Sequence, residues 1–159
     1  MSREALMREA LAQARLAAAE GETPVGAVVA RGDEIVASAR NRREALGDPT
    51  AHAEILALRE AARRLGRRRL SDCTLYVTLE PCPMCAGAMV AACLGACVFA
   101  CEDPRQGCCE SVYALTQEPS FYHRLPCAGG LLRDEARALL VSFFETKRPA
   151  PGADKGDSV

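Results

Sequence analysis

The sequence predicts a single α/β domain in which a β-sheet lies between layers of helices. Short apolar runs that are typical of buried strands alternate with stretches of about 10 to 15 residues whose apolar side chains recur at helical spacing. This alternation favours a sheet covered on both faces, with at least one pair of parallel strands joined through a helix. The chain has 159 residues, which suits one domain and is too short for two full ones.

The first predicted elements are a helix and a β-hairpin. Residues 3–19 place apolar side chains at helical spacing, with Ser2 suited to cap the helix and Gly21 suited to end it. Two short apolar runs then flank a Gly-Asp turn, over residues 24–30 (PVGAVVA) and 35–40 (IVASAR). A helix that leads into a hairpin therefore opens the domain.

The middle of the chain alternates between helix and strand. A loop over residues 41–50 ends in residues that suit a turn before a helix. A helix is predicted over residues 51–66 and a strand over residues 73–80. A second helix over residues 83–93, which begins with proline, leads into a further strand over residues 96–101.

The last part of the chain contains an irregular stretch, a helix and a tail. Residues 102–127 show no regular period, whereas residues 131–148 predict an amphipathic helix. Residues 149–159 are rich in proline, glycine and aspartate, and we expect them to form a flexible tail. The predicted domain therefore covers residues 1–148.

The charge balance excludes a protein that attracts nucleic acid through its overall field. The chain has 20 lysines and arginines against 21 aspartates and glutamates, a formal net charge of -1. An RNA partner would therefore have to bind a local basic patch, for which residues 63–69 (RRLGRRR) are a candidate. The same residues can instead be a solvated helix end, where late arginines complement the helix dipole.

Composition also indicates a reducing compartment. No run approaches the roughly 18 apolar residues of a membrane span, and residues 1–13 carry charges throughout, so we expect neither a span nor a secretory signal. Nine cysteines, an odd count, favour reduced thiols over a disulfide framework. We therefore expect a cytoplasmic protein. Seven of the cysteines are interpreted as small buried hydrophobic residues: Cys73, Cys93, Cys97, Cys101, Cys108, Cys109 and Cys127.

Two cysteines and a histidine have the spacing and the position of metal ligands. Cys82 and Cys85 form a C-x-x-C pair at the first turn of a helix, where free N–H groups and the helix dipole favour thiolate. With His52 they make three ligands, and a zinc site with three protein ligands keeps a fourth position for water. His123 or another cysteine could supply a fourth ligand of a structural site. A C-x-x-C redox pair is a further alternative, but it gives no role to His52.

Glu54 is the candidate catalytic residue. On the helix that begins near residue 51 it lies closer to the apolar stripe than to solvent, and an inward carboxylate needs a partner or a purpose. A carboxylate beside the metal that is not a ligand can accept the proton of a water molecule and deliver it. The alternative is a first-turn acid that the helix dipole stabilises.

These residues carry a resemblance to a known family. His52-Ala53-Glu54 and Pro81-Cys82-Pro83-Met84-Cys85 form the signature of zinc-dependent base deaminases. Residues 48–66 and 73–89 contain these motifs, and with "TPVGAVV", "NRRE", "DPRQG" and the C-terminal "GGLLRDEARALLVSFFETKR" the chain resembles the bacterial tRNA-specific adenosine deaminases. These enzymes belong to the cytidine and deoxycytidylate deaminase superfamily.

The resemblance implies a fold, a reaction and a partner. It implies the cytidine-deaminase-like fold, with three layers and a mixed five-stranded sheet between helices, assembled as a homodimer. It also implies hydrolysis of adenosine to inosine at the wobble position of a tRNA anticodon loop. In that reaction a zinc-activated hydroxide attacks C6, while Glu54 shuttles the protons.

Further site residues follow from the resemblance alone. Asn41 would hydrogen-bond the target nucleoside, and Val25 with Gly26 would form the wall on which the base lies. Asp103 would lie in the loop that flanks the flipped nucleotide. Two of these residues also have bland explanations, because Asn41 could simply end a strand and Asp103 could simply begin a turn.

Two other functions remain open from the sequence. A zinc-dependent deaminase of a free base or nucleoside, such as guanine or cytosine, would share the motifs without needing an RNA-binding track. Small or acidic residues at Cys93, Ala96 and Glu102, where relatives often carry arginine or lysine, leave that alternative open. A non-catalytic zinc module is the third interpretation, but such a module is expected to lack Glu54.

Overall fold

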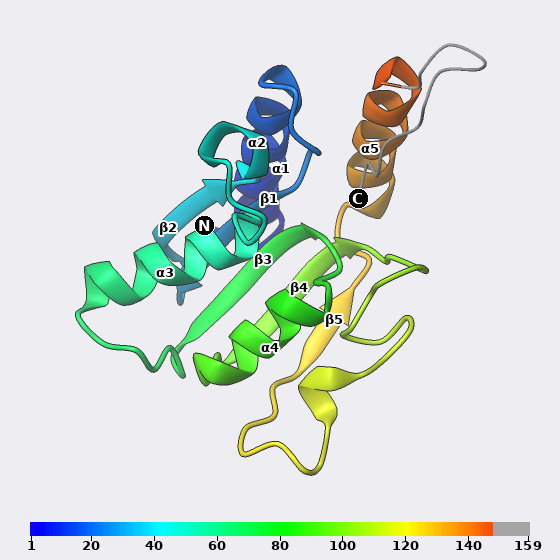
Figure 1. The fold of residues 1–159 in the computed structure, drawn as a ribbon. Coiled ribbons are helices and arrows are strands. Elements are labelled where there is room, and N and C mark those ends of the chain that lie inside the picture. The colour runs from blue at the N-terminus through cyan, green and yellow to red at the C-terminus, as the bar shows by residue number, and fades with distance from the viewer. Residues whose placement is uncertain (148–159) are drawn as a thin grey trace.

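The structure is a computed structural model of the chain that describes residues 1–147. The tail predicted over residues 149–159, and the predicted end of the domain at residue 148, lie outside the described residues. Within them the fold has the expected α/β arrangement, with a sheet between helices on both faces (Figure 1). None of the helices in residues 1–147 combines the length and the apolar character that crossing a bilayer requires.

Five strands form one mixed sheet in the order β2-β1-β3-β4-β5. Strand β1 is antiparallel to both of its neighbours, whereas β3, β4 and β5 run parallel to one another. The five-stranded mixed sheet that the resemblance implied is therefore confirmed. The strands are β1 (Gly26–Arg31), β2 (Glu34–Arg40), β3 (Cys73–Leu79), β4 (Ala96–Cys101) and β5 (Cys127–Gly129).

Two helices cover each face of the sheet. Helices α3 and α4 pack on one face, and α1 and α5 pack on the other (Figure 1). Helix α2 is a single turn in the connection that follows β2. The helices are α1 (Arg3–Ala19), α2 (Arg43–Leu46), α3 (Ala53–Leu65), α4 (Pro83–Ala91) and α5 (Arg133–Lys147), and a 3-10 turn, η1, spans Leu115–Gln117.

Strand β1 shows why the sheet is buried on both sides. Ala27 and Val29 contribute to the core shared with α3 and α4, whereas Val28 and Ala30 contribute to the core shared with α1. Burying a valine side chain fully contributes about 1.5–3 kcal/mol. Because both faces are covered, the strand is a continuous apolar run and not an alternating one.

The structure differs from several of the sequence-based boundaries: β1 begins at Gly26, α4 ends at Ala91 and α5 begins at Arg133. Three further differences concern α3, α2 and β5. Helix α3 begins at Ala53 and not at residue 51, because the backbone of His52 is extended and caps the helix. The loop predicted over residues 41–50 contains α2, whose first N–H groups are accepted by the carboxylate of Glu22. Strand β5 occupies three residues around the end of the stretch predicted as irregular, where it pairs with β4.

Gly26 lies where α1 approaches the sheet most closely. A side chain at this position would lie 2.6 Å from the backbone nitrogen of Ala14 and would also overlap the carbonyl oxygen of Ala10. The N–H group of Gly26 donates to the hydroxyl of Thr78 at 3.1 Å. The structure therefore supplies a packing reason for glycine here, in addition to the wall that the resemblance implied.

We expect Gly26→Ala to lower the free energy of unfolding by about 1–3 kcal/mol or more, because overpacking forces the backbones of α1 and β1 apart. Urea denaturation measures the loss. Gly87→Ala is the matched control, since a side chain at Gly87 in α4 would meet nothing within 4 Å. Removing glycine from a helix there should stabilise the protein by about 0.5–1 kcal/mol. Equal stabilities of the two variants would contradict the close approach of α1.

Candidate active site and metal centre

Three potential metal ligands meet where α3 and α4 begin. His52 caps α3, Cys82 caps α4, and Cys85 lies in the first turn of α4. The Nδ1 atom of His52 lies 3.6 Å from the sulfur of Cys82 and 3.4 Å from the sulfur of Cys85. The fold therefore brings together the three residues that the sequence analysis named as zinc ligands.

The start of α4 explains the position of the two thiols. Strand β3 ends at Leu79, and α4 begins with Pro83 after a short connection. Proline suits the first position of a helix because its missing N–H group would have no partner there. The N–H groups that remain free, together with the helix dipole, favour negative charge on Cys82 and Cys85.

The donor set fits a zinc ion. Two thiols and one imidazole, all with donor atoms within 4.8 Å of one another, are the types and the number of ligands in a three-residue zinc site. A hydrogen bond from the Cys85 thiol and the nearby His52 lower the pKa of Cys82 to about 4. The Cys82 sulfur and burial raise the pKa of Cys85, and a bound cation would favour the thiolate form of both cysteines.

His123 does not complete this group. Its Nε2 atom lies 2.7 Å from the carbonyl oxygen of Leu94, in a different part of the fold. Among the described residues, only His52, Cys82 and Cys85 belong to the group of donors at this position. Three ligands are the pattern of a catalytic zinc site and not of a structural one.

Glu54 is buried beside these ligands. Only 4% of its surface is exposed, and its Oε1 atom has no hydrogen-bond partner among the described residues. Burial, and then the negative charge of Cys82, raise the pKa of Glu54 to about 7. An unpaired buried carboxylate oxygen is costly, so it points to a group that completes the site when the protein works.

A cavity of about 440 Å³ opens above the ligands. His52, Glu54 and Cys82 contribute to its lining, so the cavity ends at the metal ligands and the buried carboxylate. Its volume is within the usual range for small-molecule sites. The planar base of a nucleoside could therefore enter the cavity and reach Glu54.

Three of the four residues carried over from the family line this cavity. Val25, Asn41 and Asp103 are among its lining residues, and the N–H group of Asn41 donates to the carbonyl of Val25 at 3.1 Å. Gly26 is not among the lining residues, because it faces α1. It can act only by holding Val25 in place.

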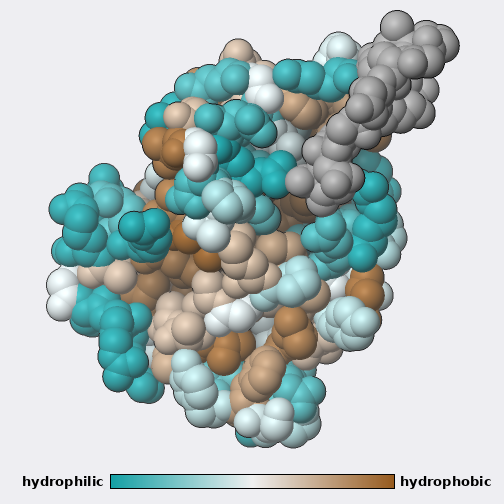
Figure 2. Space-filling model, viewed as in Figure 1, coloured by the Kyte–Doolittle hydropathy of each residue, from teal (hydrophilic) through white to brown (hydrophobic). Residues whose placement is uncertain are grey.

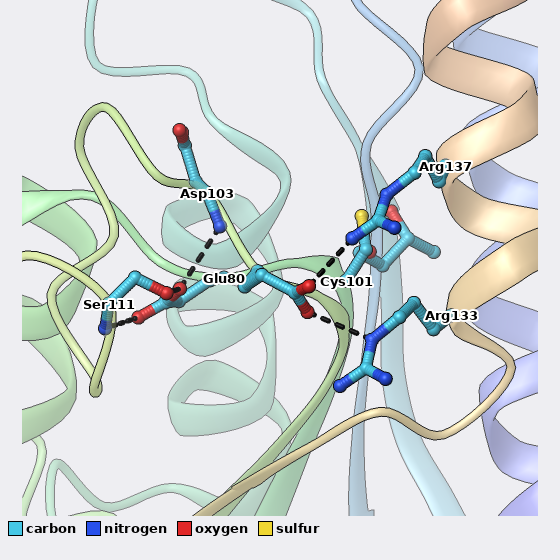
Figure 3. Close-up of polar contacts among 8 residues, drawn as sticks. Glu80, Cys101, Asp103, Ser111, Arg133 and Arg137 are labelled. Carbon is cyan, nitrogen blue, oxygen red and sulfur yellow. Dashed lines mark hydrogen bonds and ion pairs between the residues drawn. The ribbon is translucent and has the colours of Figure 1, made fainter.

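The segment that carries Asp103 wraps around the carboxylate of Glu80. Figure 3 shows this side chain next to Asp103 and Ser111. Glu80, which is 2% exposed, accepts N–H groups of Asp103, Cys109, Glu110 and Ser111 at 2.8–3.1 Å, and it also accepts the Ser111 hydroxyl. Burial alone would raise the pKa of Glu80, but these donors lower it. Glu80 therefore positions the wall of the cavity that contains Asp103.

The sequence analysis did not identify Glu80 as a site residue. The available signal was an acidic residue between a buried apolar strand and Pro81. A side chain at Gly107 would collide with the Glu80 carboxylate, so the segment needs glycine there to surround it. Neither requirement is visible in the sequence until the fold brings the two residues together.

A second acidic residue ties the segment to α5. The carboxylate of Glu102 accepts hydrogen bonds from Arg133 at 2.9 Å and from Arg137 at 2.7 Å. Figure 3 labels the two arginines, which project from α5. Leu140 and Phe144 of the same helix line the cavity. The acidic residue at position 102 therefore helps to hold α5 against the cavity.

The candidate basic patch over residues 63–69 lies away from the cavity. It is at the end of α3 opposite His52, about 20 Å along the helix axis. Arg63 and Arg64 pair with Glu60, and Arg67 pairs with an aspartate. These contacts favour the solvated helix end over an RNA-binding patch that serves the cavity.

A comparison with known protein families decides the classification. The model of the cytidine and deoxycytidylate deaminase zinc-binding region matches residues 1–101, which include the three potential ligands and Glu54. The chain belongs to this family. It is therefore a zinc-binding hydrolytic deaminase, and its α/β fold is the fold of that family.

The relatives of this deaminase include enzymes that act on tRNA. The tRNA-specific adenosine deaminase of Bacillus subtilis is 44% identical over 91% of this chain and 90% of its own. The enzyme of the same name from Aquifex aeolicus is 43% identical over 93% of this chain and 97% of its own.

Solved structures resemble the deaminase to different degrees. A structure from studies of tRNA:A34 deaminases that edit adenosine to inosine at the wobble position has a TM-score of 0.84 and 38% identity. The matched region covers 87% of this chain and 100% of the chain in that structure. A guanine deaminase from Nitrosomonas europaea has a TM-score of 0.74 and 29% identity, over 89% of this chain and 84% of its own.

We expect Glu80→Gln to loosen the cavity wall. An amide retains one acceptor oxygen and turns N–H groups toward the N–H groups of residues 103–111. Each lost hydrogen bond to a charged acceptor costs about 1.5–3 kcal/mol, so amide hydrogen exchange in this segment should accelerate about tenfold or more.

Glu22→Gln is the matched control for this variant. Glu22 is also buried, at 3% exposure, and accepts two backbone N–H groups at the start of α2. Its replacement should accelerate exchange at residues 44 and 45 and leave residues 103–111 unchanged. Unchanged exchange over residues 103–111 in Glu80→Gln would show that Glu80 does not hold this wall.

Proposed function

We propose that this deaminase converts adenosine to inosine at the wobble position of tRNA. The support that carries the proposal is the likeness over nearly the whole chain to proteins named tRNA-specific adenosine deaminase, at 44% and 43% identity. The solved tRNA:A34 deaminase structure is also more similar to this chain than the guanine deaminase structure is. An unpaired loop base suits such an enzyme because little unstacking energy is needed to bring it into a cavity.

In this proposal His52, Cys82 and Cys85 hold the zinc ion. When bound, zinc acts as a Lewis acid and lowers the pKa of a water molecule toward neutrality. The ligands come from two helix starts on one face of the sheet, so packing of α3 against α4 sets their mutual position. The N–H group of Cys82 is a further donor at the same helix start.

Glu54 acts as the catalytic residue that moves protons. Its unpaired Oε1 atom at the end of the cavity is the acceptor for a proton of the attacking water. The same carboxyl group then delivers the proton to the amino nitrogen on C6. The C–N bond breaks and ammonia leaves with that proton, while the oxygen of the water remains on the base as the carbonyl of inosine and its second proton is transferred to N1.

The cavity wall provides binding groups for the nucleoside. Asn41 hydrogen-bonds the nucleoside, and Val25 packs against the base. Asp103 belongs to the segment that Glu80 holds, so its position flanks the nucleotide only while that segment is ordered. Arg43 and Arg105 also line the cavity and are the cations placed to contact phosphate groups next to the base.

A homodimer and a cytoplasmic location remain part of the proposal. The resemblance implied the homodimer, and the location follows from the reduced state expected of nine cysteines. A tRNA substrate is consistent with that location.

We expect Glu54→Gln to keep zinc and to lose about 10²–10⁴-fold in turnover, because positioned proton transfer contributes a factor of this size. Cys82→Ala should lose the zinc ion of this site together with turnover. Metal content by mass spectrometry and ammonia release measure the two properties in the same samples. Loss of zinc from Glu54→Gln would make Glu54 a ligand and would overturn the division of roles.

The substrate is tested by ammonia release from the zinc-loaded enzyme. A tRNA anticodon stem-loop with a wobble adenosine should be deaminated, whereas free guanine, cytosine and adenosine should not. The same stem-loop with guanosine at the wobble position is the matched control. Turnover of guanine or cytosine with an inert stem-loop would replace the proposed function with free-base deamination.

A further inference from the structure

Three cysteines outside the active site meet at one point of the fold. Cys97 lies in β4, Cys127 lies in β5, and Cys109 lies in the segment between these strands. Their sulfur atoms are all within 4.8 Å of one another. Cys97 and Cys109 are buried, and Cys127 is partly buried.

The pairing of the strands brings two of these thiols together. Strands β4 and β5 are parallel, and Cys97 is the register partner of Cys127. Directly paired residues on neighbouring strands project to the same face of a sheet. The segment between the strands then turns back over that face and adds Cys109, so the cluster is a product of the register and not of sequence spacing.

The cluster distinguishes these thiols from the other buried cysteines. Cys73, Cys93, Cys101 and Cys108 are also buried, but within residues 1–147 they belong to no group of three metal donors. The sequence analysis interpreted all seven as small hydrophobic residues. For these four that interpretation stands, whereas three converging thiols can also bind a metal.

We propose that Cys97, Cys109 and Cys127 bind a thiophilic d10 metal ion, Zn²⁺ or Cu⁺, at a second site separate from the His52 site. Thiolate ligands select these soft ions over the harder Mg²⁺ and Ca²⁺. Three metal–sulfur bonds of about 2.3 Å place the sulfurs roughly 3.8–4.0 Å from one another, and here the three sulfurs lie within 4.8 Å of one another. Small side-chain rotations therefore suffice to bring all three sulfurs onto one ion.

The surroundings of the cluster suit a bound cation. All three cysteines are packed within the core between the sheet and α4, together with Phe99 and Leu125. The hydroxyl of Thr116 lies 3.2 Å from the sulfur of Cys127, so a polar oxygen is available at the edge of the cluster. A cation balances thiolate charge that such an apolar environment would otherwise disfavour.

A metal at this position would stabilise the segment that carries the cavity wall. Residues 102–126 join β4 to β5 with only one 3-10 turn, and connections of this length without regular structure are uncommon in compact domains. Glu80 holds the N–H group of Cys109, while the metal would hold its sulfur. The two contacts would tie the middle of the segment to β3 and to the pair β4 and β5.

The number of bound metal ions tests the proposal. Bound metal is removed from the full chain with a chelator under reducing conditions. The chain is then loaded with Zn²⁺ alone or with Cu⁺ alone in the presence of a competing chelator. Native mass spectrometry measures the mass of the loaded chain and hence the number of bound ions. We expect two ions per wild-type chain with at least one of the two metals. The Cys82→Ala chain should retain one ion, and loading it separately with each metal decides between Zn²⁺ and Cu⁺.

Two further variants locate the second ion. Cys127→Ser should lose one of the two ions and retain the active-site ion, because a hydroxyl is a poor ligand for soft metals. Cys73→Ala is the matched control, since it removes a buried thiol of the same core without touching either cluster, and it should bind two ions. If Cys127→Ser fails to fold, the counts for wild type and Cys82→Ala still decide the question.

Two results would overturn the proposal. One is a wild-type chain that binds a single ion with either metal, together with a Cys82→Ala chain that binds none. The other is a chain lighter by two hydrogens, with a disulfide found between two of the three cysteines after purification under reducing conditions. In the second case the cluster would be a redox pair and not a metal site.

Discussion

The site depends on the packing of α3 against α4 on one face of the sheet, with both helices beginning at the same end. This arrangement places an imidazole, two thiols and a buried carboxylate within reach of one another. Each helix start also provides free N–H groups and a partial positive charge, which stabilise thiolate. The polar chemistry is therefore confined to the end of an otherwise apolar layer. Figure 2 shows that on this face of the molecule hydrophobic residues gather in the middle of the view, with hydrophilic residues around them.

The part of the cavity wall that carries Asp103 has little regular structure, and buried polar contacts hold it in place. The Glu80 carboxylate accepts four N–H groups and a hydroxyl, an arrangement more common in a helix cap or an anion site than in a loop. A segment held in this way can present Asp103 at a fixed place without a helix or strand of its own. It also makes the wall sensitive to the charge of one buried residue.

The residues at the starts of α3 and α4 were easier to predict from the sequence than the residues that form the cavity wall. The placing of His52, Glu54, Cys82 and Cys85 at one site could be predicted from the sequence because it depends on short spacings and on helix starts, both of which are local. Helix α2, strand β5 and the role of Glu80 were missed because each depends on partners far along the chain. Gly26 was expected at the base-binding wall, but its environment is set by α1, which local patterns cannot reveal.

The residues that line the cavity come from two parts of the chain, one that matches the family model and one that lies beyond it. The ligands and Glu54 lie within residues 1–101, which match the family model, whereas Asp103, Arg105, Leu140 and Phe144 lie beyond it. The ion pairs of Glu102 with Arg133 and Arg137 join this outer part into one unit. Mutations can accumulate in that unit without touching the hydrolytic machinery. Such an arrangement would let the outer part of the cavity change while the hydrolytic part stays the same, and this chain is similar both to a tRNA:A34 deaminase structure and to a guanine deaminase structure.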